Sequence, residues 1–241
     1  MEIGINDQQR YYNDYWSDHS YRLNGHEIIR LAKILQGIAC VVETIGKTEL
    51  KICDLGCGRG WLSNELSKFG PVVGVDLSET GIAAAKERWP SVDFRVADIT
   101  QWRPDETFDL VVSSEVVEHV PDQSGFSNTI RYLLREGGYL ILTTPNGKVK
   151  KAWDKGGHGA QLVEQWLSPK ELRSLFSDVT PIMYCTFMYD FAYHGIFRIT
   201  SAPKLLRLIS MPGIMPFYNA ARNIMNMGLY QIIVGRYKLL C

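Results

Sequence analysis

The 241-residue sequence has no net charge and lacks the long apolar runs that mark membrane and secreted proteins. Its longest stretch without a charged residue, 208–221, is about 14 residues, shorter than the roughly 18 to 20 residues of a spanning helix. The first residues are polar and acidic, and they contain no apolar core like that of a signal peptide. We therefore expect a soluble protein, or at most one that rests on a membrane surface.

The sequence has few cysteines and no Cys-x-x-Cys pair. There are five cysteines, an odd number, and two of them, Cys53 and Cys57, fall in a predicted strand and the turn that follows it. This usage fits free thiols in a reducing compartment better than a disulfide framework. The sequence thus predicts a cytoplasmic protein.

Acidic residues are missing from the last part of the chain. Lys plus Arg equals Asp plus Glu at 26 each, so the whole molecule has no field that would attract a nucleic acid. Residues 191–241 contain no Asp or Glu, whereas the first 190 residues carry a net charge of −6. The cations of this basic segment are Arg198, Lys204, Arg207, Arg222, Arg236 and Lys238.

Within the basic segment, residues 191–228 are rich in aromatic residues and methionine, and we interpret them as a helical insertion. Three roles stay open for it: a cap that packs on the core, a lid over a hydrophobic substrate, and a basic apolar face on anionic lipid. The expected partners are a small-molecule acceptor and, through this segment, a membrane surface. The sequence gives no indication of the oligomeric state.

Short apolar runs alternate with helical or turn-like segments along the first three quarters of the chain. Nearly continuous Val, Ile and Leu predicts strands buried on both faces, and the alternation predicts a parallel, doubly wound α/β sheet. The runs are LKICDLG (50–56), VVGVDL (72–77), VDFRVAD (92–98), FDLVVSS (108–114) and GYLILTTP (138–145).

The length fits one domain, 1–241, with four parts. Residues 1–45 give a flap, from the Tyr- and Trp-rich stretch YYNDYW, followed by a helix with one buried stripe; 46–190 form the core. The core ends in a helix over 168–176, marked by Ser168, Pro169 and Glu171, and a strand over 179–189. The insertion 191–228 and a closing strand, 229–241, complete the chain.

The segment KICDLGCGRGW (51–61) runs from a strand through Gly56, Gly58 and Gly60 into a helix. Glycine lets the backbone approach a ligand closely, and the helix start offers free amides. The spacing is G-x-G-x-G and lacks the third position of the dinucleotide fingerprint. A ligand with a carboxylate and a ribose is therefore expected here rather than a pyrophosphate.

Three consecutive strands end in an aspartate. Asp54 could contact the ligand or only fix the turn by accepting its amides. Asp76 can accept hydrogen bonds from two ribose hydroxyls at the edge of the sheet where such folds bind ligands. Asp98 and Ile99, after the third strand, can bind an exocyclic amine and an aromatic ring.

These motifs resemble, in strict order over about 50–146, the class I S-adenosylmethionine-dependent methyltransferases: DLGCGRG, Asp76, ADI and FDLVVSSEVVEH. The resemblance implies a Rossmann-like seven-stranded sheet of order 3-2-1-4-5-7-6, with helices on both faces and an antiparallel last strand. It implies that the glycine turn wraps the methionine part, that Asp76 holds the ribose and that Asp98 and Ile99 bracket the adenine. The candidate cofactor-binding residues are then Asp54, Gly56, Cys57, Gly58, Gly60, Asp76, Leu77, Asp98, Ile99 and Ser114.

The stretch EVVEH gathers Glu115, Glu118 and His119 directly after a buried strand. If Glu115 begins a helical turn, the three side chains share one face that points at the methyl acceptor. One interpretation is helix-start electrostatics, with His119 as general base or substrate-orienting residue, because an imidazole titrates near neutrality. These three residues are the candidate catalytic residues.

A second interpretation of EVVEH is a metal site. Together with TPN (144–146), His158 and Glu164-Gln165-Trp166, the stretch is similar to metal-dependent small-RNA 2′-O-methyltransferases and to the O-methyltransferases of ubiquinone biosynthesis. That similarity implies a divalent ion such as Mg²⁺ on Glu115, Glu118, His119 and His158. Two carboxylates and two imidazoles would leave two octahedral positions for a diol or catechol.

The leading hypothesis is O-methylation of a small-molecule acceptor, hydrophobic or lipid-linked, by in-line displacement. The alternatives are N-methylation of an amino sugar or another amine, metal-dependent RNA 2′-O-methylation, and a cofactor-binding module without catalysis, because fold alone does not fix function.

Overall fold

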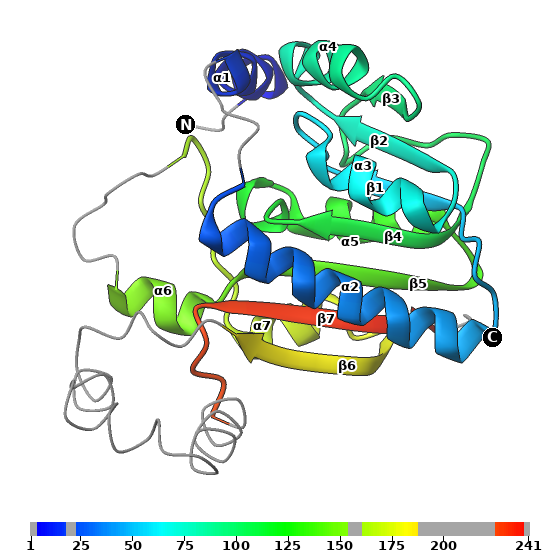
Figure 1. Ribbon diagram of the computed structural model, residues 1–241. Helices are drawn as coiled ribbons and strands as arrows, with labels where there is room; N and C mark the ends of the chain where they lie inside the picture. The colour runs from blue at the N-terminus through cyan, green and yellow to red at the C-terminus, as the bar shows by residue number, and fades with distance from the viewer. Residues whose placement is uncertain (1–3, 18–22, 154–160, 188–224, 239–241) are drawn as a thin grey trace.

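Runs of Val, Ile and Leu form the strands at the centre of the computed structural model (Figure 1), which describes residues 4–17, 23–153, 161–187 and 225–238. The parallel strands are β1 (Ile52–Leu55), β2 (Val72–Asp76), β3 (Asp93–Val96), β4 (Phe108–Ser114) and β5 (Leu134–Pro145).

The sheet closes with two antiparallel pairings. β7 (Tyr230–Tyr237) inserts between β5 and β6 (Val179–Phe187) and runs antiparallel to both. The order of the seven strands is therefore β3-β2-β1-β4-β5-β7-β6, which confirms the predicted sheet and its closing strand.

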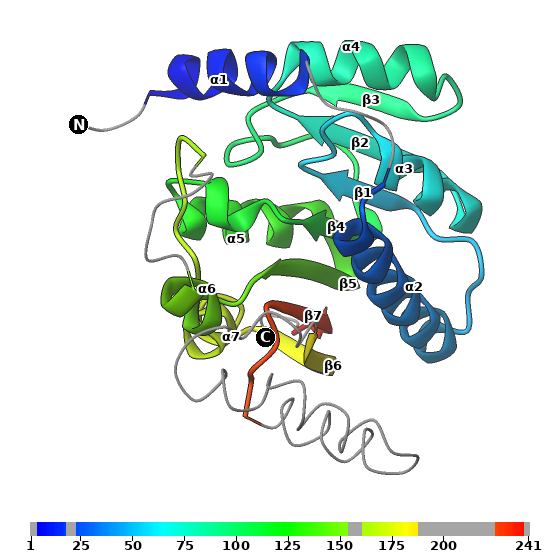
Figure 2. The ribbon, with the colours of Figure 1, turned by 60° about the vertical axis from the view of Figure 1, so that its left-hand side comes forward.

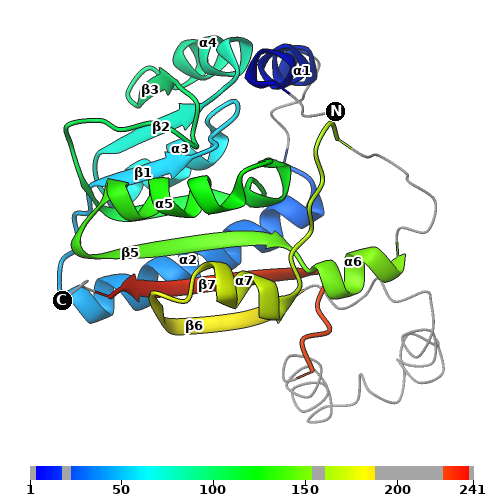
Figure 3. The same ribbon diagram turned by 180° about the vertical axis from the view of Figure 1, so that it is seen from behind.

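Helices cover both faces of the sheet (Figures 1 and 3). On one face lie α2 (Gly25–Ile45), α3 (Trp61–Leu66) and α4 (Glu79–Arg88), and on the other lie α5 (Gln123–Leu133) and α7 (Pro169–Leu175). Each face has its own apolar core, for example around Ile38 on the first and Phe126 on the second, both almost completely buried. The burial of strands on both faces explains their continuous apolar sequences.

Two helices begin where the sequence marks a start. In α2, the Asn24 side chain accepts from the backbone of Glu27, whose carboxylate accepts from the backbone of Asn24. In α7, Ser168 and Glu171 form the same reciprocal pair, as predicted. Such capping boxes satisfy amides that the helix itself leaves without partners.

The Tyr- and Trp-rich stretch that the sequence suggests as a flap forms a helix, α1 (Ile5–Ser17), which lies beside α4 (Figure 2). Short elements complete the described chain: η1 (Ser67–Phe69), η2 (Val117–His119) and α6 (Gly147–Trp153). None of the α1 side chains is fully buried in the core, so the helix is an addition to the sheet and not part of its packing.

Two predictions fall largely or wholly outside the described residues: the role of the insertion 191–228 and the metal ligand His158. They stay predictions. In the described part of the chain, no helix has the length and apolarity that crossing a membrane requires.

Candidate functional site

The turn after β1 is shaped by two glycines that have no room for a side chain. Gly56 and Gly58 have φ angles of 85° and 53°, which glycine adopts at little cost. A Cβ at Gly56 would lie 2.3 Å from Val116, and a Cβ at Gly58 would lie 2.5 Å from the Trp16 ring. The amide of Gly56 donates to the carbonyl of Val75 at 2.8 Å, which fixes the turn against β2.

Gly60 and Asp54 flank the same turn, but only Asp54 lines the cavity described below. A Cβ at Gly60 would lie 2.5 Å from Phe94, so this glycine allows close packing between α3 and the sheet and does not line the cavity described below. The Asp54 carboxylate accepts from the Ser63 hydroxyl at 2.6 Å and is 1% exposed. Burial raises the pKa of Asp54 to about 7. Asp54 therefore ties β1 to α3 while facing the cavity.

Asp76 connects the end of β2 to the glycine turn. Its Oδ2 accepts from the Gly58 amide at 2.8 Å, and its Oδ1 accepts from the Ser78 amide at 2.9 Å. Burial raises the pKa of Asp76, and these backbone amides partly oppose the shift. Each carboxylate oxygen has a second lone pair, so Asp76 can still accept from a ligand hydroxyl.

Asp98 and Ile99 follow β3 at the same edge of the sheet. The Asp98 Oδ1 accepts from both the amide and the hydroxyl of Thr100, at 2.9 and 2.7 Å. Ile99 is partly buried against the second core. The structure thus brings the ends of β1, β2 and β3 together, as the sequence predicts for parallel strands.

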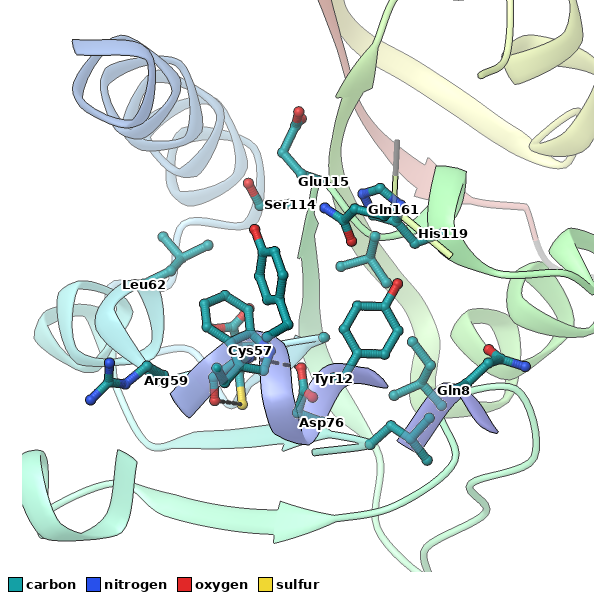
Figure 4. A pocket seen from close by; sticks show the side chains of 18 of the residues that line it. Gln8, Tyr12, Cys57, Arg59, Leu62, Asp76, Ser114, Glu115, His119 and Gln161 are labelled. Atoms are coloured by element: carbon teal, nitrogen blue, oxygen red, sulfur yellow. Dashed lines mark hydrogen bonds between the residues drawn. The ribbon is translucent and has the colours of Figure 1, made fainter. Parts of the chain in front are cut away.

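A cavity of about 710 Å³ lies above these strand ends, and Figure 4 shows Asp76 in it below Tyr12, with Glu115, His119 and Gln161 farther along. Its volume is in the range of small-molecule sites. We call it the cofactor cavity. All predicted cofactor residues except Gly60 line it: Asp54, Gly56, Cys57, Gly58, Asp76, Leu77, Asp98, Ile99 and Ser114.

Helix α1 supplies cavity-lining residues that the sequence reasoning missed. Gln8, Tyr12, Tyr15 and Trp16 all line the cofactor cavity. The Tyr12 hydroxyl is buried without a hydrogen-bond partner among the described residues, and burial raises its pKa. The Tyr- and Trp-rich stretch YYNDYW was a signal in the sequence, but it did not indicate that these residues line the cavity.

Side-chain hydrogen bonds dock α1 onto the start of α4. The Asn13 side chain accepts from the Ser78 hydroxyl at 2.9 Å and from the Thr80 amide at 3.2 Å. The Gln9 amide donates to the carbonyl of Leu77 at 3.3 Å. Because Ser78 also bonds Asp76 through its amide, α1 is tied to the residues that form the floor of the cavity.

The prediction that Glu115 begins a helical turn is wrong. Its φ is 60°, in the left-handed region, and its amide donates to the Thr143 carbonyl at 3.0 Å, so the chain is still bound to β5 at this point. The short helix begins only at Val117. The Glu115 carboxylate instead turns toward α2, where Arg30 lies 3.5 Å away.

Glu118 and His119 do lie together. Glu118 is 1% exposed, and its Oε2 accepts from the Thr144 hydroxyl at 2.8 Å. Its other oxygen is 3.7 Å from His119 Nε2. On the opposite side of the ring, His119 Nδ1 is 2.9 Å from the carbonyl of Val163. A carbonyl can only accept, so Nδ1 carries the proton, and in the neutral ring Nε2 has a free lone pair.

Burial sets the protonation of this cluster. It raises the pKa of Glu115 to about 8, against the opposing effect of Arg30, and that of Glu118 to about 7. Burial also lowers the pKa of His119, although the Val163 carbonyl and Glu164 act the other way. His119 is therefore a neutral base near pH 7, beside carboxyls that are partly protonated.

The described residues do not gather as a metal site. Among them, no group of three or more His, Cys, Asp or Glu side chains could hold an ion. His119 Nδ1 and Glu118 Oε2 already have protein partners, and Glu115 faces Arg30. The fourth predicted ligand, His158, lies outside the described residues.

A second cavity, of about 540 Å³, adjoins the first. The two share Tyr15, Asn24, Glu27, Arg30, Glu115, His119 and Gln161. The remaining residues of this adjoining cavity are His26, Glu118, Pro145, Lys150, Glu164, Trp166 and Tyr230. Glu115 and His119 thus line both cavities, one above the strand ends and one beside α2 and β7.

Curated relatives share the central part of the chain. A ubiquinone biosynthesis O-methyltransferase of Bradyrhizobium sp. (strain ORS 278) is 36% identical over 146 residues, 58% of this chain and 57% of that protein. Another with this name, from Paramagnetospirillum magneticum (strain ATCC 700264 / AMB-1), is also 36% identical, over 58% of each chain. The chain therefore spans little more than half the length of these relatives.

Solved structures share the fold over nearly the whole chain. The N-methyltransferase NodS from Bradyrhizobium japonicum WM9, in complex with S-adenosyl-L-homocysteine, has a TM-score of 0.63 at 14% identity, covering 95% of this chain and 100% of that one. Magnesium protoporphyrin IX methyltransferase from Synechocystis PCC 6803, with bound S-adenosyl-L-homocysteine, has a TM-score of 0.64 at 16% identity, covering 97% and 99%.

A family model described as a methyltransferase domain matches residues 47–181, from the end of α2 through β5 to the first residues of β6. Because that match covers more than half of the chain, the protein belongs to the methyltransferase domain family.

Proposed function

We propose that the protein transfers the methyl group of S-adenosylmethionine to a hydroxyl of a small molecule held in the adjoining cavity. The observation that carries the proposal is the shared wall: His119, with a free lone pair on Nε2, lines both cavities. An acceptor hydroxyl beside His119 can then approach a methyl donor in the cofactor cavity in line.

For the cofactor-binding residues we propose the roles that the resemblance to the family implies. Asp76 accepts from the ribose hydroxyls, and Asp98 and Ile99 bracket the adenine at the end of β3. We assign the methionine part to the turn at Gly56 and Gly58, whose backbone lines the cavity and packs closely against Val116 and Trp16. The lining of the cofactor cavity supports each of these assignments.

His119, with Glu118 beside it, can take up the proton that the acceptor hydroxyl loses in the transfer. The acceptor oxygen forms a bond to the methyl carbon, the bond from that carbon to sulfur breaks, and S-adenosylhomocysteine leaves with the electron pair. The proton of the acceptor hydroxyl passes to His119 Nε2. The Glu118 carboxylate, 3.7 Å from Nε2, then stabilises the imidazolium. The Val163 carbonyl holds the ring in the orientation that this step needs.

Oxygen as the methylated atom is supported by the curated relatives, whose names describe O-methyltransferases. A base beside the acceptor also fits a hydroxyl, which must lose its proton, better than an amine that is already neutral when it reacts.

Calorimetry and a labelled-methyl assay test the proposal. The protein should bind S-adenosylhomocysteine, and with trideuteromethyl cofactor it should label a component of a macromolecule-free cell extract. His119→Ala should lower that labelling by roughly 10²- to 10⁴-fold. His119→Ala and Glu118→Gln should leave the affinity for S-adenosylhomocysteine unchanged. Absence of cofactor binding, or equal labelling by the wild type and both variants, contradicts the proposal.

We also propose a reducing, cytoplasmic location. Cys40, Cys53, Cys57 and Cys185, the described cysteines, are free thiols, and Cys53 and Cys57 are buried at the cofactor turn. Burial raises the pKa of both buried thiols, which keeps them protonated and unreactive.

A further inference from the structure

Three residues that line the adjoining cavity each carry a buried polar atom with no hydrogen-bond partner among the described residues. These atoms are Nε of Arg30, Oε1 of Glu115 and Nε1 of Trp166. Leaving such a group unpaired is costly, so each one in a native structure calls for a partner. The two nitrogens are donors, the Glu115 oxygen accepts when its carboxyl is ionised, and the proposed transfer to a hydroxyl at His119 uses none of them.

The three groups come from different walls. Arg30 projects from α2, Glu115 follows β4, and Trp166 lies in the segment between α6 and α7. A ligand that satisfies all of them has to accept in two directions and donate in a third. Neighbouring hydroxyls on a ring do both, because each hydroxyl is one donor and two acceptor lone pairs.

The segment that carries Trp166 is held firmly. The Gln165 amide donates to the Glu118 carbonyl at 2.7 Å, and the Gln231 side chain donates to the Leu167 carbonyl at 2.8 Å. Gln123 also donates to the carbonyl of Gln165, at 2.9 Å. The indole N–H is therefore set in place before any ligand binds.

The lining offers little to an apolar acceptor. Among the described residues of the adjoining cavity, Pro145 is the only aliphatic side chain, and no Leu, Ile, Val or Met is present. The other apolar surface of this cavity comes from the rings of Tyr15, Trp166 and Tyr230, which offer flat faces to a ring-shaped acceptor. The sequence-based expectation of a hydrophobic acceptor stays a prediction.

The charges of the lining also restrict the acceptor. Four carboxylic side chains, Glu27, Glu115, Glu118 and Glu164, line this cavity together with two permanent cations, Arg30 and Lys150. Burial raises the pKa of Glu115 to about 8 and that of Glu118 to about 7, so these two carboxyls are partly protonated near pH 7 and the lining carries no large excess of either charge. Carboxylates, amides and a guanidinium together suit an uncharged ligand with many hydroxyls.

We propose that the adjoining cavity binds an acceptor ring rich in hydroxyls, a sugar or a cyclitol, through Arg30, Glu115 and Trp166, and presents one hydroxyl of that ring to His119. This inference rests on the proposed O-methyl transfer and adds the chemical class of the acceptor. The curated relatives act, by name, in ubiquinone biosynthesis, so the proposed acceptor class differs from the one that their names suggest.

The test compares two sets of probes with the full chain and S-adenosylmethionine. The first set is p-nitrophenyl glycosides of glucose, galactose, mannose and rhamnose, together with myo-inositol. The second set is 3,4-dihydroxybenzoate and 4-methylcatechol. We expect methylation of at least one member of the first set, with kcat/KM above that of both catechols.

Two variants test whether the N–H of Trp166 contributes to binding of the acceptor. Trp166→Phe keeps an aromatic ring and removes the N–H donor, and it should raise KM for the glycoside by roughly three- to tenfold while leaving the affinity for S-adenosylhomocysteine unchanged. Trp89→Phe is the matched control, because Trp89 Nε1 is also buried without a partner among the described residues but lines neither cavity. It should leave KM unchanged.

The outcomes separate the two proposals. Preferred methylation of a catechol overturns the hydroxyl-rich acceptor and keeps O-methyl transfer. Binding of S-adenosylhomocysteine without methylation of any glycoside or inositol, or equal KM for both variants, also overturns it. If S-adenosylhomocysteine does not bind at all, the proposed function itself fails.

Discussion

The substitution Gly58→Ala tests whether α1 lies over the glycine turn in solution. An alanine Cβ at this position would lie 2.5, 2.8 and 2.9 Å from three atoms of the Trp16 ring, and these are its nearest neighbours. The φ of 53° adds a second cost that does not depend on Trp16. The two costs can be measured separately.

The backbone cost of alanine in the left-handed region is roughly 1–2 kcal/mol. The overpacking against Trp16 adds about 1–3 kcal/mol. Gly46→Ala is the control: Gly46 has a φ of 69°, and a Cβ there would have no atom within 4 Å. Gly46→Ala should therefore lower the free energy of unfolding by the backbone cost alone, and Gly58→Ala by both costs.

Urea unfolding followed by far-ultraviolet circular dichroism gives the free energies. In a Trp16→Ala background, the cost of Gly58→Ala should fall to that of Gly46→Ala, which gives a coupling energy of about 1–3 kcal/mol between positions 16 and 58. Equal costs for the two alanine substitutions in the wild type, or an unchanged cost of Gly58→Ala without the Trp16 ring, would refute the docking of α1 on the turn.

Three further predictions concern charge. Asp76→Asn removes a charged acceptor, so calorimetry should show roughly 10- to 100-fold weaker binding of S-adenosylhomocysteine. Between pH 6.5 and 8 the folded state retains protons on Glu115, Glu118 and Asp54, whose pKa values are about 8, 7 and 7, after the unfolded chain has released them. The free energy of unfolding should therefore fall with rising pH in this window, by about 2 kcal/mol from Glu115 alone. Glu115→Gln should make this fall smaller. A wild-type free energy of unfolding that does not change with pH in this window contradicts the prediction. Exhaustive chelation should leave turnover unchanged, because His119 and Glu118 already have protein partners, whereas activity lost and then restored by Mg²⁺ would support the four-ligand metal site.

The sheet and most of the cofactor cavity could be predicted because their signals are local. Strands that are buried on both faces have continuous runs of Val, Ile and Leu, and parallel strands place their carboxyl ends at one edge of the sheet. Asp76 and Asp98 follow directly from that rule. The glycine turn is also local, since the positive φ angles of Gly56 and Gly58 are properties of consecutive residues.

The parts that could not be predicted depend on contacts between distant positions. Asn13 forms hydrogen bonds with Ser78 and Thr80, which lie 65 and 67 positions away in the sequence, and no local pattern near Asn13 predicts these contacts. The spacing of EVVEH suggests a helix, but the hydrogen bond from Glu115 to β5 overrides it. The adjoining cavity is likewise assembled from α2, the segment before α7 and the start of β7.

At position 115, the residue that would make the fold more stable is not the residue that the proposed site uses, because the backbone of Glu115 is left-handed. Glycine or asparagine would relax that conformation, yet neither supplies a carboxylate opposite Arg30. A search for heat-tolerant variants is therefore expected to find replacements at position 115 that survive higher temperature and turn over more slowly.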